Sequence, residues 1–245
     1  MTIPKIIHQT WKTDKIPDKV KKYQESWKTF HPNWEYMLWT DKDNENLIKE
    51  HYPWFLDIYE NYEYNIQRVD AVRPFILYHY GGMYVDLDYE CYKTFDDVVN
   101  LYSDKVYIVE SPWPGEKVQN SLMISPKGNP FWKVVIKNMI KNKNLKFSGK
   151  VETVLKTTGP NLIEHSVKEH PVELLDSKKF NPSAVVNNCS GCYANHFGTS
   201  TWVSTNDTVH VACTFFHRYL LVPIVLFFLF YLYNKKVRVI HHITR

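Results

Sequence analysis

Short apolar runs alternate with helical patterns along most of the chain. Strands are predicted where apolar or aromatic side chains form a run too short for a helix: residues 3–8, 34–39, 83–86, 106–110 and 122–125. Helices are predicted where apolar side chains recur every three or four residues: 17–30, the segment after Thr40-Asp41, 65–80 and 130–140. This alternation predicts an α/β layer fold around a largely parallel sheet.

The helix predicted at residues 65–80 leads directly into a pair of carboxylates. Pro74 lies inside it and has no backbone N–H, so we expect a kink or a restart near Arg73. Gly81-Gly82 should end the helix, and the strand that follows runs into Asp86-Leu87-Asp88. The acidic pair is therefore expected at the end of a buried strand.

A long apolar run occupies the C-terminal part of the sequence. Residues 219–233 carry no charge, and as a helix they would reach roughly 22 Å, compared with roughly 30 Å for a hydrocarbon core. A buried core helix is the alternative, but the run has no polar face. We expect a folded domain at residues 1–207, a membrane helix or anchor at 214–234 and a basic tail at 235–245.

The topology of that helix stays open. The basic tail favours a cytosolic C-terminus by the positive-inside tendency, which would place the domain across the membrane. No N-terminal signal peptide is visible to carry it there, so tail anchoring with the domain in the cytosol competes. Both topologies make the membrane a partner.

Charge and composition exclude one class of partner. The formal net charge is +4, but Lys235, Lys236, Arg238 and Arg245 lie in a tail without acids, so the preceding body is close to neutral. A neutral body has no broad phosphate-binding surface, and nucleic acid is not expected as a partner. Aromatic residues make up 16% of the chain, which suits stacking on sugars or bases, or a large core.

The four cysteines are too few for a disulfide-rich framework. Cys189-Ser-Gly-Cys192, with His196 after it, is compatible with half of a zinc site or with a local disulfide. A second ligand pair at matching spacing is missing, so plain thiols are the expectation.

Two Asp-x-Asp triplets occur, and their contexts separate them. Asp41-Lys42-Asp43 lies in a polar stretch and is interpreted as a helix cap. Asp86 and Asp88 end an apolar strand, point to the same side of it and have no basic neighbour in sequence. Carboxylates at a strand end in an open α/β sheet are typical ligands of Mg²⁺ or Mn²⁺. The pattern predicts a metal site.

Asp70 and Arg73 precede the acidic pair on the predicted helix. They are three residues apart and share a face. A surface ion pair is the ordinary interpretation of such spacing, but their place immediately upstream of the strand favours a role in the same cleft as Asp86.

The motifs together resemble glycosyltransferase family 32, which includes the yeast-type α-mannosyltransferases and the catalytic subunits that mannosylate inositol phosphorylceramide. The resemblance is strong from Ile3 to Glu90 and rests on three segments: Ile3-Pro-Lys-Ile-Ile-His-Gln-Thr-Trp11, Pro32-Asn-Trp-Glu-Tyr-Met-Leu-Trp-Thr-Asp41, and Gln67-Arg-Val-Asp-Ala-Val-Arg73 with His79-Tyr-Gly-Gly-Met-Tyr-Val-Asp-Leu-Asp88. Beyond Glu90 it thins. Pro74 stands where the family usually carries an aromatic residue, a change that would retilt Arg73.

The resemblance implies a GT-A fold, a Rossmann-like mixed sheet flanked by helices, and a role for each matching residue. The nucleotide would be lined by the end of the first strand, with Trp11 stacking on the base: His8, Gln9, Thr10 and Trp11. Ribose, sugar and phosphates would be held by Asp70, Arg73, Tyr84 and Asn120. The metal would be bound by Asp86, Asp88 and His196, and the catalytic set is Asp70, Arg73, Asp86 and Asp88.

The same resemblance implies a retaining, metal-dependent hexosyltransferase. Its cofactor would be Mn²⁺ or Mg²⁺ and its donor a nucleotide sugar, GDP-mannose ahead of a UDP-sugar. Its acceptor would be a membrane lipid of the inositol-phosphoceramide type, or else a protein-linked glycan. An endomembrane (Golgi or ER) location and a regulatory or membrane subunit fit this picture.

Two alternatives from other classes remain. The first is a catalytically inactive sugar- or nucleotide-binding relative. The second is a metal-dependent phosphohydrolase, which is disfavoured because two carboxylates and one distant histidine are too few ligands for a two-metal site.

Overall fold

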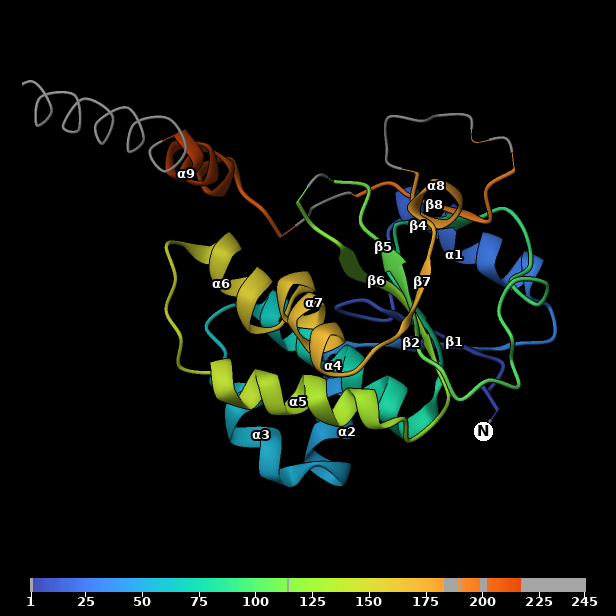
Figure 1. The fold of residues 1–245 in the computed structure, drawn as a ribbon, viewed down its shortest axis with the longest axis horizontal. Helices are drawn as coiled ribbons and strands as arrows, with labels where there is room; N and C mark the ends of the chain where they lie inside the picture. Colours follow the sequence, from blue (N-terminus) through green and yellow to red (C-terminus); the bar gives the residue numbers. More distant parts are fainter. Residues whose placement is uncertain (1, 114, 183–188, 190, 199–201, 217–245) are drawn as a thin grey trace, which may run out of the picture. The chain divides into compact units, whose positions relative to one another are not determined.

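The computed structural model describes residues 2–113, 115–182, 189, 191–198 and 202–216, the last six of these for their backbone only. The chain divides into two compact units (Figure 1). The larger consists of residues 1–148 with 152–200, and the smaller of residues 149–151 with 201–245. The candidate site residues all lie in the larger unit.

A six-stranded mixed sheet forms the centre of the larger unit, in the order β2-β1-β3-β6-β5-β7. Its strands are β1 (Ile6–Thr10), β2 (Glu35–Trp39), β3 (Gly82–Val85), β5 (Tyr107–Glu110), β6 (Val118–Ser125) and β7 (Glu173–Leu175). β1 runs parallel to β2 and β3, whereas β6 is antiparallel to both β3 and β5. The expectation of a largely parallel sheet is thus right for β2-β1-β3 and wrong at β6.

A separate two-stranded sheet joins two segments that are far apart in sequence. It pairs β4 (Tyr89–Cys91) with β8 (Ala194–His196) in antiparallel register, with Tyr89 opposite His196. Neither strand was predicted. This small sheet brings the late part of the chain next to the Asp86-Leu87-Asp88 triplet.

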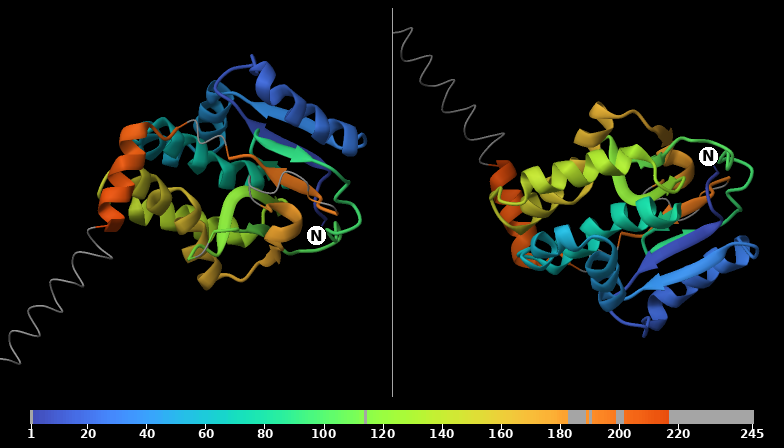
Figure 2. Two further views of the ribbon diagram at one scale, coloured as in Figure 1. Left: turned by 90° about the horizontal axis from the view of Figure 1, so that it is seen from above. Right: turned by 90° about the horizontal axis from the view of Figure 1, so that it is seen from below.

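Helices cover both faces of the main sheet, as both views in Figure 2 show. Their bounds are α1 (Asp18–Phe30), α2 (Asp41–His51), α3 (Pro53–Glu60), α4 (Asn65–Tyr80), α5 (Pro130–Asn142), α6 (Lys150–Thr157), α7 (Pro160–Glu169) and α8 (Ser177–Phe180), with α9 (Thr205–Phe216) in the smaller unit.

Strand β3 supplies side chains to the cores on both faces of the sheet. Met83 and Val85 pack with Trp27 of α1, while Tyr84 packs with Phe75 of α4. This alternation is what a strand buried on both faces requires. It also points the tyrosine toward the helix that carries Asp70 and Arg73.

Helix α4 runs without a break through Pro74, so the predicted restart is wrong. The ring removes the donor that would reach the carbonyl of Asp70, but packing on both sides holds the helix, whose residues from Asp70 to Leu77 are all buried. The predicted Gly-Gly stop is confirmed, since Gly81 is the C-cap with a positive φ of 69°.

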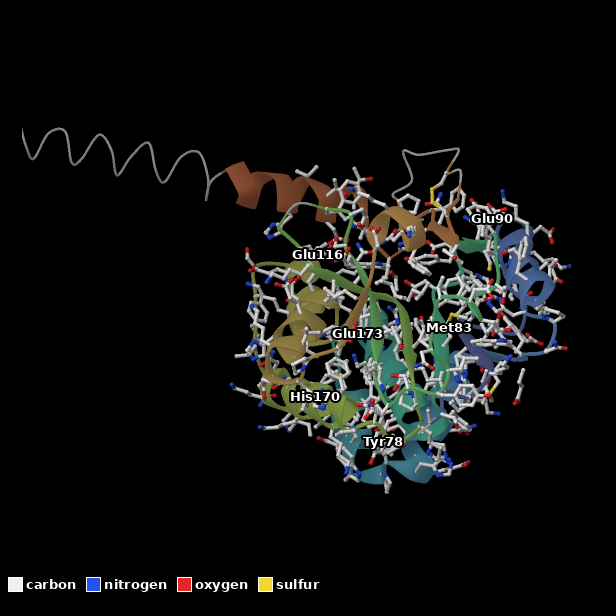
Figure 3. The ribbon with its side chains drawn as sticks, turned by 45° about the vertical axis from the view of Figure 1, so that its right-hand side comes forward. Tyr78, Met83, Glu90, Glu116, His170 and Glu173 are labelled. Carbon is white, nitrogen blue, oxygen red and sulfur yellow. A yellow bond between two sulfur atoms is a disulfide. The ribbon has the colours of Figure 1, made fainter. Side chains whose placement is uncertain are left out.

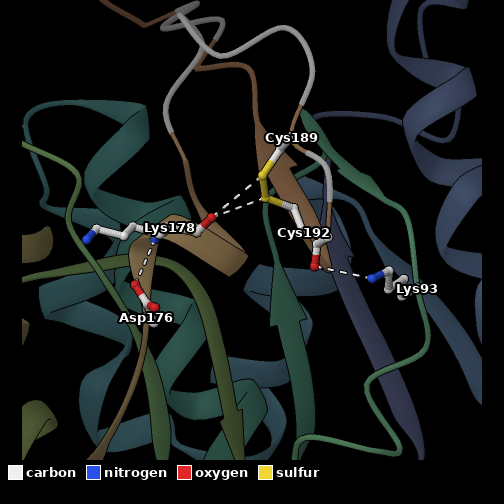
Figure 4. The surroundings of a disulfide bond; sticks show 6 residues. Lys93, Asp176, Lys178, Cys189 and Cys192 are labelled. Carbon is white, nitrogen blue, oxygen red and sulfur yellow. Dashed lines mark hydrogen bonds between the residues drawn. A yellow bond between two sulfur atoms is a disulfide. The ribbon is translucent and has the colours of Figure 1, made fainter.

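The cysteine pair forms a disulfide, Cys189–Cys192, beside the carbonyl of Lys178 (Figure 4). Lys93 donates to the carbonyl of Gly191 within the same turn. The expectation of plain thiols is therefore wrong for this pair, and Cys91 is a buried free thiol. The disulfide closes the turn immediately before β8.

The predicted membrane helix falls mostly outside the described residues. Only residues 214–216 of the segment 214–234 are described, as the end of α9, and the basic tail 235–245 is not. Within the described part of the chain, no helix combines the length and the apolar character needed to cross a bilayer.

Gly82 gives a direct test of how closely β1 and β3 must approach. A Cβ at Gly82 (φ 89°) would lie 2.5 Å from the backbone oxygen of Ile6, whereas one at Gly128 (φ 73°) would meet nothing within 4 Å. Gly128→Ala should lower the free energy of unfolding by only about 1 kcal/mol, the cost of a side chain in the left-handed conformation. Gly82→Ala should cost about 2–3 kcal/mol more, because backbone must move. Equal losses in urea unfolding would contradict this packing.

Candidate active site

The acidic triplet lies at the edge of the sheet where β1 and β3 end and β6 begins. Asp86 follows β3 directly; its backbone N–H donates to the carbonyl of Ser121 at 2.8 Å, and its own carbonyl accepts from Gln9 Nε2 at 3.2 Å. Tyr89 N–H then bonds back to the Asp86 carbonyl at 3.1 Å, closing a turn. The backbone of Asp86 is therefore held from both neighbouring strands.

A buried guanidinium joins the helix to this triplet. Arg73 Nη2 lies 3.0 Å from Asp70 Oδ1 and 3.0 Å from Asp86 Oδ1, while Nη1 donates to the carbonyl of Asn120 at 2.9 Å. Asn120 Nδ2 also donates to Asp70 Oδ1 at 3.2 Å. One cation between two carboxylates, with three of the four residues almost fully buried, forms a rigid charged unit.

The same burial shifts the titration of these groups. Burial raises the pKa of Asp70 to about 6, although the charge of Arg73 opposes the shift. Burial also raises the pKa of Asp86, again against Arg73, and the charge of Asp88 adds to the rise. Burial alone would lower the pKa of Arg73, but the carboxylates, Asp86 first, keep it raised and the side chain charged.

Tyr84 and Thr10 hold Asp86 in position through hydrogen bonds. Tyr84 OH donates to Asp86 Oδ1 at 2.8 Å and lies 3.0 Å from Thr10 Oγ1. The guanidinium of Arg73 stacks over the Tyr84 ring at 4.8 Å. Tyr84 is fully buried, so it orients the carboxylate and the arginine rather than presenting its hydroxyl to a ligand.

Three side chains converge into a set with metal-ligand chemistry. One ligand atom each from Asp86, Asp88 and His196 all lie within 4.8 Å of one another. His196 Nε2 is 3.1 Å from Asp88 Oδ1, and the His196 ring stacks on Tyr89 at 4.5 Å between centroids. Two carboxylates and one imidazole fit Mn²⁺ well and Mg²⁺ acceptably.

The electrostatics of His196 depend on the acidic pair. Burial would lower its pKa, but the hydrogen bond to Asp88 and the charges of Asp88 and Asp86 raise it overall. The three side chains therefore share a concentrated negative charge that favours a cation, whether a proton on the imidazole or a metal ion.

His8 and Gln9 of β1, which the family resemblance assigned to the nucleotide, bind other parts of the protein. His8 is fully buried, with Nε2 at 2.9 Å from the Gly81 carbonyl and Nδ1 accepting from Trp39 Nε1 at 3.1 Å. Burial lowers the pKa of His8 to about 4, so the ring is neutral. Gln9 uses its amide on the Asp86 carbonyl and on Tyr36 OH. Both side chains are engaged by the protein and hold β1 in place.

Trp11 differs from its neighbours on β1. Its ring packs against the small cluster that contains Tyr23 and Leu87, the middle residue of the triplet. Its Nε1 is buried and has no hydrogen-bond partner among the described residues. An orphaned buried donor beside the acidic pair is compatible with a ligand that supplies the acceptor.

Two supporting residues carry no recognisable signal in the sequence. Tyr89 stacks on His196 and its hydroxyl lies 3.3 Å from Ser121 Oγ, while Trp27 Nε1 donates to the Tyr89 carbonyl at 2.9 Å.

The other acidic triplet, Asp41-Lys42-Asp43, has its predicted role as a helix cap. Asp43 and Thr40 form the capping box of α2.

The paired aspartates thus lie in a turn at the end of a buried strand, and the mixed sheet that contains this strand is covered by helices on both faces. Residues 17–105 match the family described as "Glycosyltransferase sugar-binding region containing DXD motif". The resemblance of this chain to glycosyltransferase family 32 is therefore confirmed.

Two of the similar curated proteins come from yeasts. Inositol phosphoceramide mannosyltransferase 2 of Schizosaccharomyces pombe is 42% identical over 64% of this chain and 44% of its own length. Mannosyl phosphorylinositol ceramide synthase CSH1 of Saccharomyces cerevisiae is 39% identical over 69% of this chain and 43% of its own. The chain thus spans less than half the length of these two relatives.

Similar solved structures establish the fold. The PaToxG glycosyltransferase has a TM-score of 0.57 at 19% identity and covers 69% of this chain and 71% of its own. The ligand-free glycosyltransferase domain of the YGT toxin has a TM-score of 0.55 at 9% identity and covers 71% and 80%. The predicted GT-A-like α/β fold is confirmed for the larger unit.

The raised pKa of Asp70 predicts a pH dependence of stability. The pKa of this carboxyl is ordinarily 3.8 and is about 6 in the folded chain. Between pH 4 and 6 the folded chain therefore binds more protons at Asp70 than the unfolded chain does. Its contribution to stability therefore falls as pH rises through that window, by on the order of 2–3 kcal/mol. Asp70→Asn should lack this component. The unfolding free energies of wild type and variant, measured by urea unfolding at several pH values between 4 and 6, should therefore change differently with pH. Parallel curves would contradict the assignment.

Proposed function

We propose that this chain is a metal-dependent glycosyltransferase that moves a hexose from a nucleotide-diphosphate sugar to a membrane-associated acceptor. The observation that carries the proposal is the convergence of Asp86, Asp88 and His196 within 4.8 Å at the strand edge, backed by the buried Arg73. A compact set of hard ligands beside a fixed cation suits a diphosphate, whose charge grows as the glycosidic bond breaks.

The residues divide by the part of the donor that they would contact. Asp86, Asp88 and His196 would hold Mn²⁺ or Mg²⁺, which when bound offsets charge on the diphosphate. Arg73 would add a second positive charge on the sugar and phosphate side. Trp11 would stack on the base and offer its unpaired Nε1–H, and Asp70 and Asn120 would accept or donate to the ribose and sugar hydroxyls.

The substrates are inferred from the relatives. Their names describe mannosyl transfer to inositol phosphoceramide, which favours a mannose donor, with GDP as the expected nucleotide, and a sphingolipid acceptor. An acceptor of this kind would place the protein at an endomembrane, and a membrane or regulatory subunit is part of the same proposal. Retention of configuration is part of the same proposal.

The hydrogen-bond network bears on how retention would be achieved. Asp70 and Asp86 both pair with Arg73, and Asp88 pairs with His196, so each carboxylate of the site is already engaged. A front-face displacement, in which the departing phosphate takes the proton of the acceptor hydroxyl, needs no carboxylate nucleophile. Mass-spectrometric detection of a covalent glycosyl-enzyme on any of the three would exclude it.

A donor screen tests the reaction, and a substitution in the Asp41-Lys42-Asp43 triplet supplies its control. The purified chain with Mn²⁺ and each common GDP- and UDP-sugar should release nucleotide from one donor. Asp88→Ala should lower that rate by about 100-fold or more, since a group that stabilises the leaving charge is lost. Asp41→Ala, in the other triplet, should keep wild-type activity. Turnover of no donor, or equal activity of Asp88→Ala, would refute the proposal.

Tyr84→Phe separates orientation of Asp86 from its charge. The variant keeps the buried ring under Arg73 but loses the hydroxyl between Thr10 and Asp86. Mn²⁺ affinity should fall by about 10-fold, as for other residues that orient metal ligands, with little change in stability. Isothermal titration with Mn²⁺ measures this, and unchanged affinity would show that the hydroxyl is dispensable.

A further inference from the structure

The hairpin between β5 and β6 lies at the same edge of the sheet as the acidic pair. β6 is antiparallel to β3, with Leu122 opposite Val85, so the residues just before β6 lie beyond the end of β3. Figure 3 shows Glu116 of this hairpin and Glu90 toward one end of the molecule, and Tyr78 and His170 toward the other. Side chains on the hairpin are therefore placed to meet whatever approaches the donor site.

Trp113 is the large apolar side chain that this hairpin exposes. Its side chain is 56% exposed. A lone exposed tryptophan is ordinary on a protein surface, and Trp54 at the opposite edge is 58% exposed. Exposure alone therefore assigns nothing, and the way in which the hairpin is held matters more.

Polar contacts fix the backbone of Trp113. Its N–H donates to Ser111 Oγ at 3.1 Å, and Ser111 Oγ donates to Glu116 Oε2 at 2.6 Å. Gln119 Nε2 reaches the same Glu116 oxygen at 3.3 Å. These contacts order the backbone at Trp113, so binding there would cost little backbone entropy.

The same glutamine connects the hairpin to the metal ligands. Gln119 Oε1 accepts from Ser121 Oγ at 3.3 Å, and Ser121 Oγ lies 3.3 Å from Tyr89 OH. Tyr89 in turn stacks on His196. The position of Trp113 is thus tied through side chains to the ring that completes the acidic site.

A polar hollow of about 380 Å³ adjoins the hairpin. Gly115 of the hairpin and Asn161 and Glu164 of α7 are among the residues that line it. Its size is within the range of small-molecule sites, and its lining offers donors and acceptors for hydroxyl groups. Gly115, two residues after Trp113, therefore brings the hairpin to the rim of a polar space.

We propose that Trp113 is the platform on which the acceptor stacks, and that the acceptor presents a polyhydroxylated six-membered ring, a cyclitol or a hexose. The C–H face of such a ring packs on the indole while its hydroxyls remain free for the polar hollow and for the reaction. This assignment rests on the proposed function and specifies the acceptor side of the same site. Trp113 determines specificity in it and takes no part in donor activation.

The test uses the purified chain, Mn²⁺, the donor found in the screen and a water-soluble inositol phosphodiester as acceptor. Trp113→Ala should raise the acceptor KM about five- to tenfold, the effect of one aromatic stacking contact. Donor hydrolysis without acceptor should stay at the wild-type rate. Trp113→Phe should recover most of the affinity, because it keeps a flat ring. Trp54→Ala, equally exposed at the other edge, should leave the acceptor KM unchanged.

Three results would overturn the platform. The first is an acceptor KM of Trp113→Ala equal to that of wild type, and the second is a fall in donor hydrolysis in parallel with transfer. The third is weaker binding to anionic vesicles as the sole change, which would make Trp113 a membrane contact. Saturation-transfer NMR with the same phosphodiester tests the platform without turnover. If the wild type hydrolyses no donor but its phosphodiester signal disappears in Trp113→Ala alone, the proposed function fails and the platform stands.

Discussion

The buried contact of Arg73 with Asp70 and Asp86 is the interaction on which the rest of the site depends. It joins α4 to the end of β3, and through the carbonyl of Asn120 it also fixes the start of β6. Burying three charges is costly, and such a group persists only where geometry and hydrogen bonds are well satisfied. Here Asn120 donates to Asp70 and Tyr84 donates to Asp86, and these hydrogen bonds help to offset the cost of desolvation and hold the Asp86 carboxylate in one orientation.

Much of the chain near the site serves to hold that orientation rather than to contact a ligand. His8 and Gln9, which the family resemblance assigned to the nucleotide, have their polar atoms engaged by Gly81, Trp39, Tyr36 and the Asp86 carbonyl. Thr10 acts through Tyr84 in the same way. Side chains whose positions are set by buried neighbours need little reorganisation when a donor binds. Such preorganised groups stabilise charge in a transition state most effectively.

The sequence predicted the elements that depend on local patterns, and it missed those that depend on distant pairing. Periodicity and glycine placement located β3, α4 and the acidic pair that follows β3, and context separated Asp86-Leu87-Asp88 from the capping triplet at Asp41. The pairing of β4 with β8 was not predictable, because it joins residues more than 100 positions apart, such as Tyr89 and His196, through strands of only three residues. The antiparallel direction of β6 was missed for the same reason. The Cys189–Cys192 bridge is local, and its spacing was compatible with a disulfide, but the spacing alone did not distinguish a disulfide from plain thiols.

The central claim is that Asp86, Asp88 and His196 form one metal site at the end of β3. Crystals grown with Mn²⁺ and a nucleoside diphosphate, with diffraction recorded at the manganese absorption edge, test it most directly. The predicted result is an anomalous peak among these three side chains that disappears in Asp88→Ala. An anomalous peak at Asp41 and Asp43, or none beside Asp86 in crystals that contain the bound diphosphate, would contradict it.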